Sequence, residues 1–204
     1  MSFRKEEKLL AIQNKIPELI EWVFNNGGKK LFPDRIVSST YFDNDSLAMF
    51  NDSEDGVVPR KKIRVRSYDT QPHYQSKSLL EVKISSIEGR FKTSQEVTNI
   101  KRLFQLGYYD SQYGLCFPKT RVTYIRSYFE IFNIRLTIDK DIKYTLSQKN
   151  RESKLFINEP KIIVELKAPN HVSTEFLSKK FNFQRIRFSK YANSIDMIYA
   201  NQKI

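Results

Sequence analysis

The chain has 204 residues, of which 40% are hydrophobic and 13% aromatic, so it can bury a core of its own and falls within the usual size of one domain. Its 35 Lys and Arg residues against 23 Asp and Glu residues give a net charge of +12, which favours an anionic partner or a membrane surface. One cysteine and two histidines exclude an internal disulfide framework and leave too few ligands for a zinc centre rich in either residue.

The sequence has no apolar run of about 18 residues, and its N-terminus lacks the charged and then apolar pattern of a signal peptide. We therefore expect a cytoplasmic protein with one domain over residues 1–204, and any membrane partner would be a separate chain. A Walker-type Gly-rich loop and a Gly-x-Gly-x-x-Gly turn are also missing from a sequence with six glycines. Any binding of phosphate groups would therefore rest on side chains.

A loosely alternating segment over residues 1–11 comes first, and a predicted helix follows it. Apolar residues recur at helical spacing from Ile16, Pro17 falls in the first turn, and Gly27 stands where the helix should end. Residues 36–50 then predict a strand, an Asn/Asp-rich turn and a short helical turn.

Five further segments alternate between charged or polar residues and apolar ones, which is the period of a β-strand. They are KKIRVRSY at 61–68, LLEVKIS at 79–85, YIRSYFE at 124–130, NIRLTID at 133–139 and IIVELKA at 162–168. Helical patterns occur near residues 94–107, 172–182 and 189–201, the last with Ala192, Ile195, Ile198 and Tyr199 expected inward.

Each predicted strand has one charged face. Arg64 and Arg66 share a face while Ile63 and Val65 take the other, and the remaining four segments repeat this arrangement. For any single strand the usual meaning is one face on a core and one in water. Five strands whose faces together concentrate Arg, with isolated Glu residues, in the form charged-x-charged favour a ligand instead. If the sheet closes, these faces line a common lumen and the apolar faces point outward, under the helices.

A lumen lined with so many cations would repel itself unless an anion of matching charge occupied it. A triphosphate or polyphosphate meets this demand, because arginine pairs with adjacent phosphate oxygens through two hydrogen bonds. Carboxylates on the same faces either bind Mg²⁺ or Mn²⁺, which bridges carboxylate and phosphate oxygens, or form salt bridges with neighbouring cations. The carboxylates open to both alternatives are Glu6, Glu81, Glu130 and Glu165.

Six blocks of the sequence occur in an order that is not expected by chance. They are SSTYFDNDSLAMF, KIRVRSY, LEVKIS, YIRSYF with IRLTID, VELKAP and RFSKYANSI. In these blocks, over nearly its whole length, the chain resembles the VTC-type polyphosphate polymerase domain of the triphosphate tunnel metalloenzyme (CYTH-like) superfamily. The resemblance implies an α+β fold, a closed eight-stranded antiparallel β-barrel that forms the tunnel, with flanking helices.

The resemblance also implies roles for individual residues. The residues that match the phosphate-binding basic positions of the family are Lys8, Arg64, Arg66, Lys83, Arg126 and Arg135, and all but Lys8 are expected to act in catalysis. Arg187 and Lys190 resemble the basic pair near the start of the final helix, and Lys92 extends the basic path.

Glu165 resembles the metal ligand of the family. The first strand departs from the wider superfamily, since a Glu-x-Glu-x-Lys run would be expected and only Glu6-x-Lys8 is present. Glu6 is therefore expected as the further metal carboxylate, and the number of metal carboxylates is left open.

The resemblance implies a metal-dependent enzyme that uses Mn²⁺ or Mg²⁺ to transfer the terminal phosphate of ATP to a polyphosphate chain. A tripolyphosphatase or nucleoside triphosphatase of the same fold is the first alternative. A non-catalytic module that binds polyphosphate or nucleic acid is the second, since 15 Phe, 11 Tyr and one Trp permit base stacking. Nucleic acid is not expected, because a duplex needs an external patch rather than a lumen. A degenerate tunnel that acts as a sensor or scaffold is the third.

Overall fold

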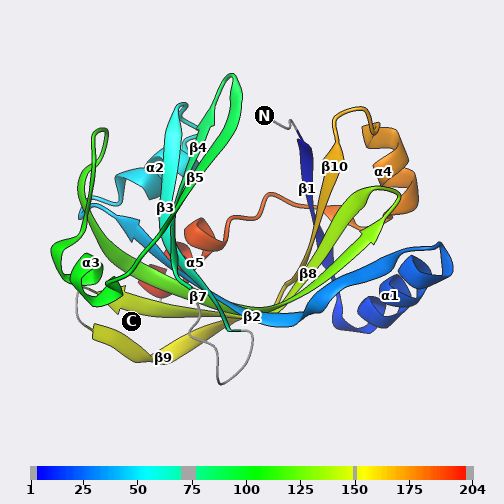
Figure 1. The fold of residues 1–204 in the computed structure, drawn as a ribbon, viewed down its shortest axis with the longest axis horizontal. Coiled ribbons are helices and arrows are strands. Elements are labelled where there is room, and N and C mark those ends of the chain that lie inside the picture. The colour runs from blue at the N-terminus through cyan, green and yellow to red at the C-terminus, as the bar shows by residue number, and fades with distance from the viewer. Residues whose placement is uncertain (1–3, 70–76, 149–150, 201–204) are drawn as a thin grey trace. The chain divides into compact units, whose positions relative to one another are not determined.

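The computed structural model of the chain describes residues 4–69, 77–148 and 151–200, and its elements are labelled in Figure 1. The strands are β1 (Arg4–Ala11), β2 (Lys29–Asp43), β3 (Arg60–Asp69), β4 (Leu79–Ser86), β5 (Gly89–Glu96), β6 (Tyr108–Asp110), β7 (Gly114–Ile131), β8 (Ile134–Gln148), β9 (Arg151–Glu159), β10 (Ile162–Pro169) and β11 (Gln184–Arg185). The helices are α1 (Ile16–Asn25), α2 (Ala48–Glu54), α3 (Ile100–Leu106), α4 (Thr174–Lys180) and α5 (Lys190–Ala200), with a 3-10 turn at Gln13–Lys15. In the described part of the chain, no helix is both long and apolar enough to cross a membrane.

The strands form one 11-stranded sheet in the order β11-β1-β10-β8-β7-β2-β3-β4-β5, with β6 on β7 and β9 on β8. Pairs such as β1 with β10 and β3 with β4 are antiparallel, so the α+β fold class is confirmed. The closed eight-stranded barrel is not confirmed. Among the described residues β5 and β11 are the two ends of the order, and no ladder joins them. Closure of the sheet stays a prediction.

The chain divides into two compact units. The first comprises Met1–Arg35, Tyr124–Ile142 and Pro160–Phe188, and the second comprises Ile36–Thr123, Lys143–Glu159 and Ser189–Ile204. Three long strands, β2, β7 and β8, contribute residues to both units. A single domain over residues 1–204 stays a prediction.

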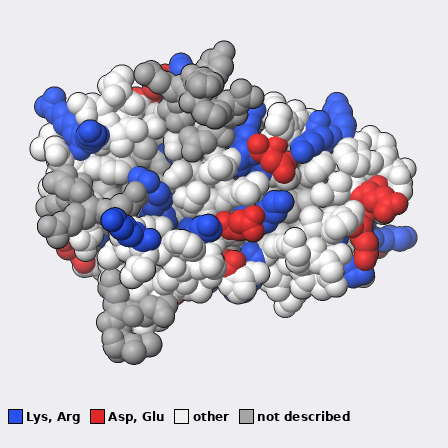
Figure 2. Space-filling model, turned by 90° about the horizontal axis from the view of Figure 1, so that it is seen from below, with Lys and Arg blue, Asp and Glu red and all other residues white. Residues whose placement is uncertain are grey.

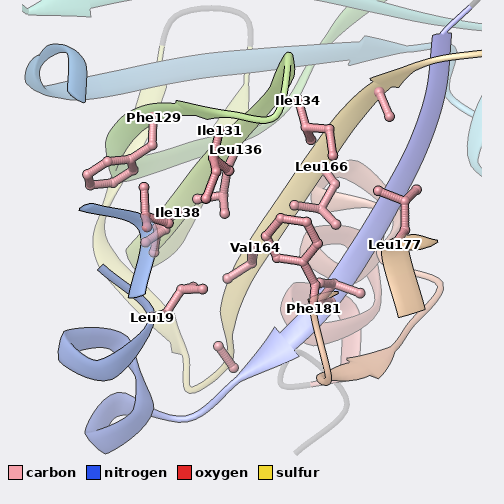
Figure 3. Close-up of a cluster of buried hydrophobic side chains, with 14 of the residues drawn as sticks. Leu19, Phe129, Ile131, Ile134, Leu136, Ile138, Val164, Leu166, Leu177 and Phe181 are labelled. Atoms are coloured by element: carbon pink, nitrogen blue, oxygen red, sulfur yellow. The ribbon is translucent and has the colours of Figure 1, made fainter. Parts of the chain in front are cut away.

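The hydrophobic core of the first unit lies between its strands and the helices α1 and α4, as Figure 3 shows. Leu136 of β8 and Val164 of β10 are fully buried there, in one cluster with Leu19 of α1 and Leu177 of α4. Because strand side chains alternate between the two faces, the charged residues between them on β8 and β10 point away from this core. The helices thus cover the apolar face of these strands and leave the charged face to the site.

Helix α1 begins and ends where the sequence predicts. Pro17 lies in its first turn, where the missing N–H has no helical partner to lose. The chain leaves the helix through Gly27, which has φ 78 and so adopts a conformation that favours glycine. At Gly28 an added Cβ would lie 2.5 Å from the side chain of Val23. These two glycines let β2 start close against the end of α1.

The boundary predicted between strand and helix near residues 94–107 is wrong at its start. β5 extends to Glu96, and α3 occupies only Ile100–Leu106. Asn99 caps α3, since its side-chain oxygen accepts a hydrogen bond from the Arg102 N–H at 2.9 Å. The cap fixes the start of the helix, and the polar residues before it pair with β4 instead.

Helix α5 is confirmed, and three of its four predicted inward residues are buried. The exception is Tyr199, which is 36% exposed, so this part of the prediction is wrong. Tyr191, in the first turn, is the buried tyrosine instead. The predicted end of this helix at residue 201 lies outside the described residues.

Candidate functional site

The charged face of the first unit is a grid built from β1, β10 and β8. In that strand order, one cross-strand row is Glu6, Lys167 and Arg135, and the next is Lys8, Glu165 and Thr137. Side chains directly opposite each other in such rows have their Cβ atoms about 5 Å apart. The antiparallel register therefore brings four of the predicted site residues, Glu6, Lys8, Arg135 and Glu165, onto one face.

Arg126 of β7 belongs to the same unit and is held in a buried ion pair. Its Nε and Nη2 donate to the two carboxylate oxygens of Asp139 at 2.5 and 2.7 Å, and Nη2 lies 3.8 Å from Oε2 of Glu165. Burial would lower the pKa of Arg126, but the charge of the fully buried Asp139 raises it well above the usual value. This pair fixes the guanidinium of Arg126 beside Glu165.

Glu165 is 7% exposed, and its Oε1 forms an ion pair with Nζ of Lys167 at 2.9 Å. Among the described residues, no group of three or more His, Cys, Asp or Glu side chains is arranged to hold a metal ion. Mg²⁺ commonly takes only one or two carboxylates, with phosphate oxygens and waters completing its shell. Glu165 and Glu6, in neighbouring rows of one face, fit an open site of that kind and do not fit a closed protein cage.

The segment that follows β11 is hydrogen-bonded to β1 at Lys8. The N–H of Ile186 donates to the carbonyl oxygen of Lys8 at 2.9 Å, and Nζ of Lys8 donates to the carbonyl oxygen of Phe188. Arg187 lies between these two contacts and belongs to the first unit, whereas Lys190 begins α5 and belongs to the second. The predicted basic pair is therefore divided between the two units.

In the second unit, lysines occupy a whole row of the charged face. Lys62 of β3, Lys83 of β4 and Lys92 of β5 lie directly opposite one another. Nζ of Lys62 donates to Oγ of Ser189 at 2.8 Å, and Nζ of Lys92 lies 2.8 Å from Oε1 of Glu81. Like charges that face each other across strands are destabilising, so this row is suited to bind an anion.

The neighbouring row contains Arg64 opposite Glu81. Glu81 is 3% exposed, and its Oε2 accepts a hydrogen bond from Nε of Arg64 at 2.7 Å. Burial raises the pKa of Glu81, but the charge of Arg64 and the hydrogen bond from Lys92 outweigh it and lower the pKa to about 2. Glu81 therefore holds cations in place, which is the salt-bridge alternative. The two rows together contain the cations Lys62, Arg64, Lys83 and Lys92 and the carboxylate Glu81.

Tyr41 of β2 lies opposite Arg64, and Nη1 of Arg64 is 3.3 Å from its hydroxyl oxygen. Burial would raise the pKa of Tyr41, but the charges of Arg64 and Arg66, with a contribution from Lys190, lower it to about 8. The ring of Tyr41 stacks on that of Tyr191 in α5, with 5.2 Å between centroids. These contacts place the start of α5 close to the predicted residues of β3.

Exposed charges contribute less to the site. Figure 2 shows one face of the molecule, on which Lys and Arg side chains are interspersed with acidic and uncharged ones. The side chain of Glu130 is 41% exposed and its Oε1 lies 3.4 Å from Nζ of Lys29, so it too takes the salt-bridge alternative. Ion pairs of this exposed kind contribute little, and the binding chemistry rests with the buried and half-buried cations.

Sequence reasoning missed several residues that complete the two faces. Those that lie two or four residues from a predicted site residue, on the same strand face, are Lys62, Thr137, Asp139 and Lys167. The strand alternation could have identified these four residues, because it places them on the same face as the predicted ones. Tyr41 follows no charged alternation, and only its contacts with Arg64 and Tyr191 identify it.

Comparison with known protein families finds one family whose model matches this chain. The VTC domain model matches residues 3–110 and 92–199. No curated protein matches the chain.

Solved structures that are similar to this chain have low sequence identity to it. A candidate adenylate cyclase from Vibrio parahaemolyticus shares 15% identity with a TM-score of 0.58, covering 96% of this chain and 98% of that one. The PH1819 protein from Pyrococcus horikoshii shares 14% with a TM-score of 0.56, covering 96% and 99%. HpAC1 from Hippeastrum, a candidate adenylyl cyclase with a dominant triphosphatase activity, shares 14% with a TM-score of 0.49, covering 95% and 96%. Because the VTC domain model matches almost the whole length of the chain, the chain belongs to the VTC domain family.

Proposed function

We propose that this protein is a metal-dependent phosphotransferase that adds the terminal phosphate of ATP to a polyphosphate chain. The observation that carries the proposal is the row of Lys62, Lys83 and Lys92, which face one another across three strands. An anion with several charges along its length matches such a row, and polyphosphate is an anion of this kind. Membership of the VTC domain family supports the same choice.

Roles for the remaining residues follow from their contacts. In the second unit Arg64 and Arg66 bind phosphate oxygens together with Lys83 and Lys92, and Glu81 keeps Arg64 and Lys92 oriented. Lys190 adds positive charge close to Arg64. Salt bridges that hold a cation in one geometry lower the entropy lost when the substrate binds.

In the first unit we assign Lys8 and Arg135 to phosphate binding, with Arg187 in the segment fastened to Lys8. Glu165 and Glu6 would hold Mg²⁺ or Mn²⁺, which as a Lewis acid neutralises charge on phosphate oxygens. Arg126, fixed by Asp139, keeps the carboxylate of Glu165 in position and adds charge beside it.

The reaction needs no covalent enzyme intermediate. An oxygen of the terminal phosphate of the polyphosphate chain attacks the γ-phosphorus of ATP, and the bond from that phosphorus to the β,γ-bridging oxygen breaks. ADP leaves with the electron pair of that bond, and the chain gains one phosphate. The residues contribute by positioning the two phosphate chains and by neutralising their charge.

The test is to incubate purified protein with ATP and Mn²⁺ and to follow free phosphate and long-chain polyphosphate together. Wild type should form polyphosphate, and Lys83→Gln should lose this activity. Lys101→Gln, which removes an exposed lysine of α3, is the matched control and should leave it unchanged.

Two results would overturn the proposal. Release of phosphate without polyphosphate would mean that water is the acceptor, and the protein would be a triphosphatase. If wild type forms neither product, a non-catalytic binding module becomes the better description.

A further inference from the structure

Two buried polar atoms on β8 have no hydrogen-bond partner. Among the described residues, these are Nε of Arg135 and Oγ1 of Thr137. Thr137 is only 3% exposed. Buried polar groups in native proteins are almost always hydrogen-bonded, because burial removes their water without replacing it. Two unpaired groups on one strand therefore require an explanation.

The two atoms belong to side chains on the same face of β8. Residues two apart along a strand have Cα atoms about 7 Å apart and side chains on one side. Their cross-strand neighbours on β10 are Lys167 and Glu165, which are already paired with each other at 2.9 Å. The neighbouring charged groups thus satisfy one another and leave the two side chains of β8 available.

The chemistry of the two groups limits what their partner can be. Nε of an arginine is only a donor, so its partner must be an acceptor, and a threonine hydroxyl can donate to an acceptor as well. The guanidinium is charged, which favours an anionic acceptor. A phosphate group offers several acceptor oxygens on one small tetrahedral centre and satisfies both donors together.

We propose that Arg135 and Thr137 form a two-point binding site for one phosphate group of a triphosphate or polyphosphate. The hydroxyl of Thr137 donates to one phosphate oxygen, and Nε of Arg135 donates to another. This inference rests on the proposed function and deepens it, because it places a phosphate group directly beside Glu165, which faces Thr137 across the strands.

Thr137→Val tests the hydroxyl, because it replaces the hydroxyl with a methyl group of nearly the same size. No protein group loses a hydrogen bond, so the melting temperature of the ligand-free protein should stay the same or rise. Calorimetric titration with inorganic triphosphate in EDTA should show affinity reduced by about 10- to 100-fold, the usual effect of losing one hydrogen bond to a charged group. Thr137→Ser keeps the hydroxyl and should bind close to wild type.

Thr120→Val is the matched control. The Thr120 hydroxyl is buried and donates to the carbonyl oxygen of Thr145 at 3.3 Å, so its removal breaks a bond within the protein. This variant should melt at a lower temperature and bind triphosphate as wild type does. The two Thr→Val changes therefore have opposite expected effects on stability and on binding.

A double-mutant cycle with Arg135→Met tests the shared phosphate. If both side chains hold one phosphate group, the loss of affinity in the double variant should be clearly smaller than the product of the two single losses. Losses that simply multiply would mean that the two side chains bind separately, which would overturn the two-point site.

Other outcomes separate this inference from the proposed function. Unchanged triphosphate affinity in Thr137→Val would overturn the inference, and the ATP assay above would still decide the function. A loss that appears only with Mn²⁺ present would overturn it as well, since the hydroxyl would then contact a metal-bound water. If wild type does not bind triphosphate at all, both proposals are wrong.

Discussion

The charged faces of the two units follow the same strand alternation but balance their charges differently. In the first unit, Arg126 pairs with Asp139 and Lys167 pairs with Glu165, so cations and carboxylates neutralise each other in place. In the second unit Arg64 and Lys92, which belongs to the lysine row, share the carboxylate of Glu81. The first face thus holds carboxylates beside its cations, and the second keeps an excess of positive charge around one carboxylate. Alternation collects charges on a face, and the register decides whether they cancel or accumulate.

Breaking the buried pair of the first unit should have the largest effect on stability. Arg126→Met leaves the fully buried carboxylate of Asp139 without its bidentate partner, and uncompensated buried charges of this kind cost about 3–5 kcal/mol. Urea unfolding at pH 7 measures this loss. Arg102→Met, on the exposed surface of α3, is the control and should change little. If Arg126→Met lowers the free energy of unfolding by less than about 1 kcal/mol, the ion pair of Arg126 with Asp139 does not stabilise the fold as a buried pair should.

Glu165→Gln tests whether Glu165 of the first unit binds the metal or only stabilises the fold. Turnover of ATP should fall by about 100-fold or more, because a metal on phosphate oxygens is worth several kcal/mol in the transition state. The amide has nearly the same size, and its oxygen can still accept from Nζ of Lys167, so the melting temperature should change little. Titration with Mn²⁺ gives a second readout, in which affinity should fall. Glu175→Gln, an exposed change in α4, should behave as wild type in both measurements.

Glu81→Gln tests whether the carboxylate of the second unit stabilises its cations. The folded pKa of about 2 lies below the ordinary value of 4.5, so the stabilisation is fully present above pH 4.5 and is lost as pH falls toward 2. It amounts to at most about 3 kcal/mol at neutral pH and less than half of that at pH 3. The measurement is the difference in free energy of unfolding between wild type and variant at both pH values. A difference that does not change with pH would contradict the lowered pKa.

The smallest expected effects compare one lysine from each face. Lys83→Gln removes a charge between two other lysines and should raise the free energy of unfolding by up to about 1 kcal/mol. Lys167→Gln removes a charge paired with Glu165 and should lower it by a similar amount. Thermal unfolding at low and high salt measures both, and salt should reduce both shifts. If both variants shift the free energy of unfolding in the same direction, the two faces do not differ in how their charges are balanced.

The sequence by itself determined the five alternating strand segments, their charged faces and the helix α1. Ile63 and Val65 are buried while Arg64 lies on the other side of β3, as the alternation predicted. Pro17 and Gly27 marked the ends of α1. These features follow from local rules, since the backbone period of a strand or helix assigns each side chain to a face without reference to the rest of the chain.

Only the tertiary structure decided which charges meet. Glu81 could have been a metal carboxylate, but the β3–β4 register places it opposite Arg64 and within 2.8 Å of Lys92. The same applies to Asp139, which receives Arg126 from the neighbouring strand, and to Thr137, which the register sets opposite Glu165. Register depends on packing and turns along the whole strand, and a shift by one residue would turn every side chain to the other face. Partners across strands therefore cannot be read from the residues of one strand alone.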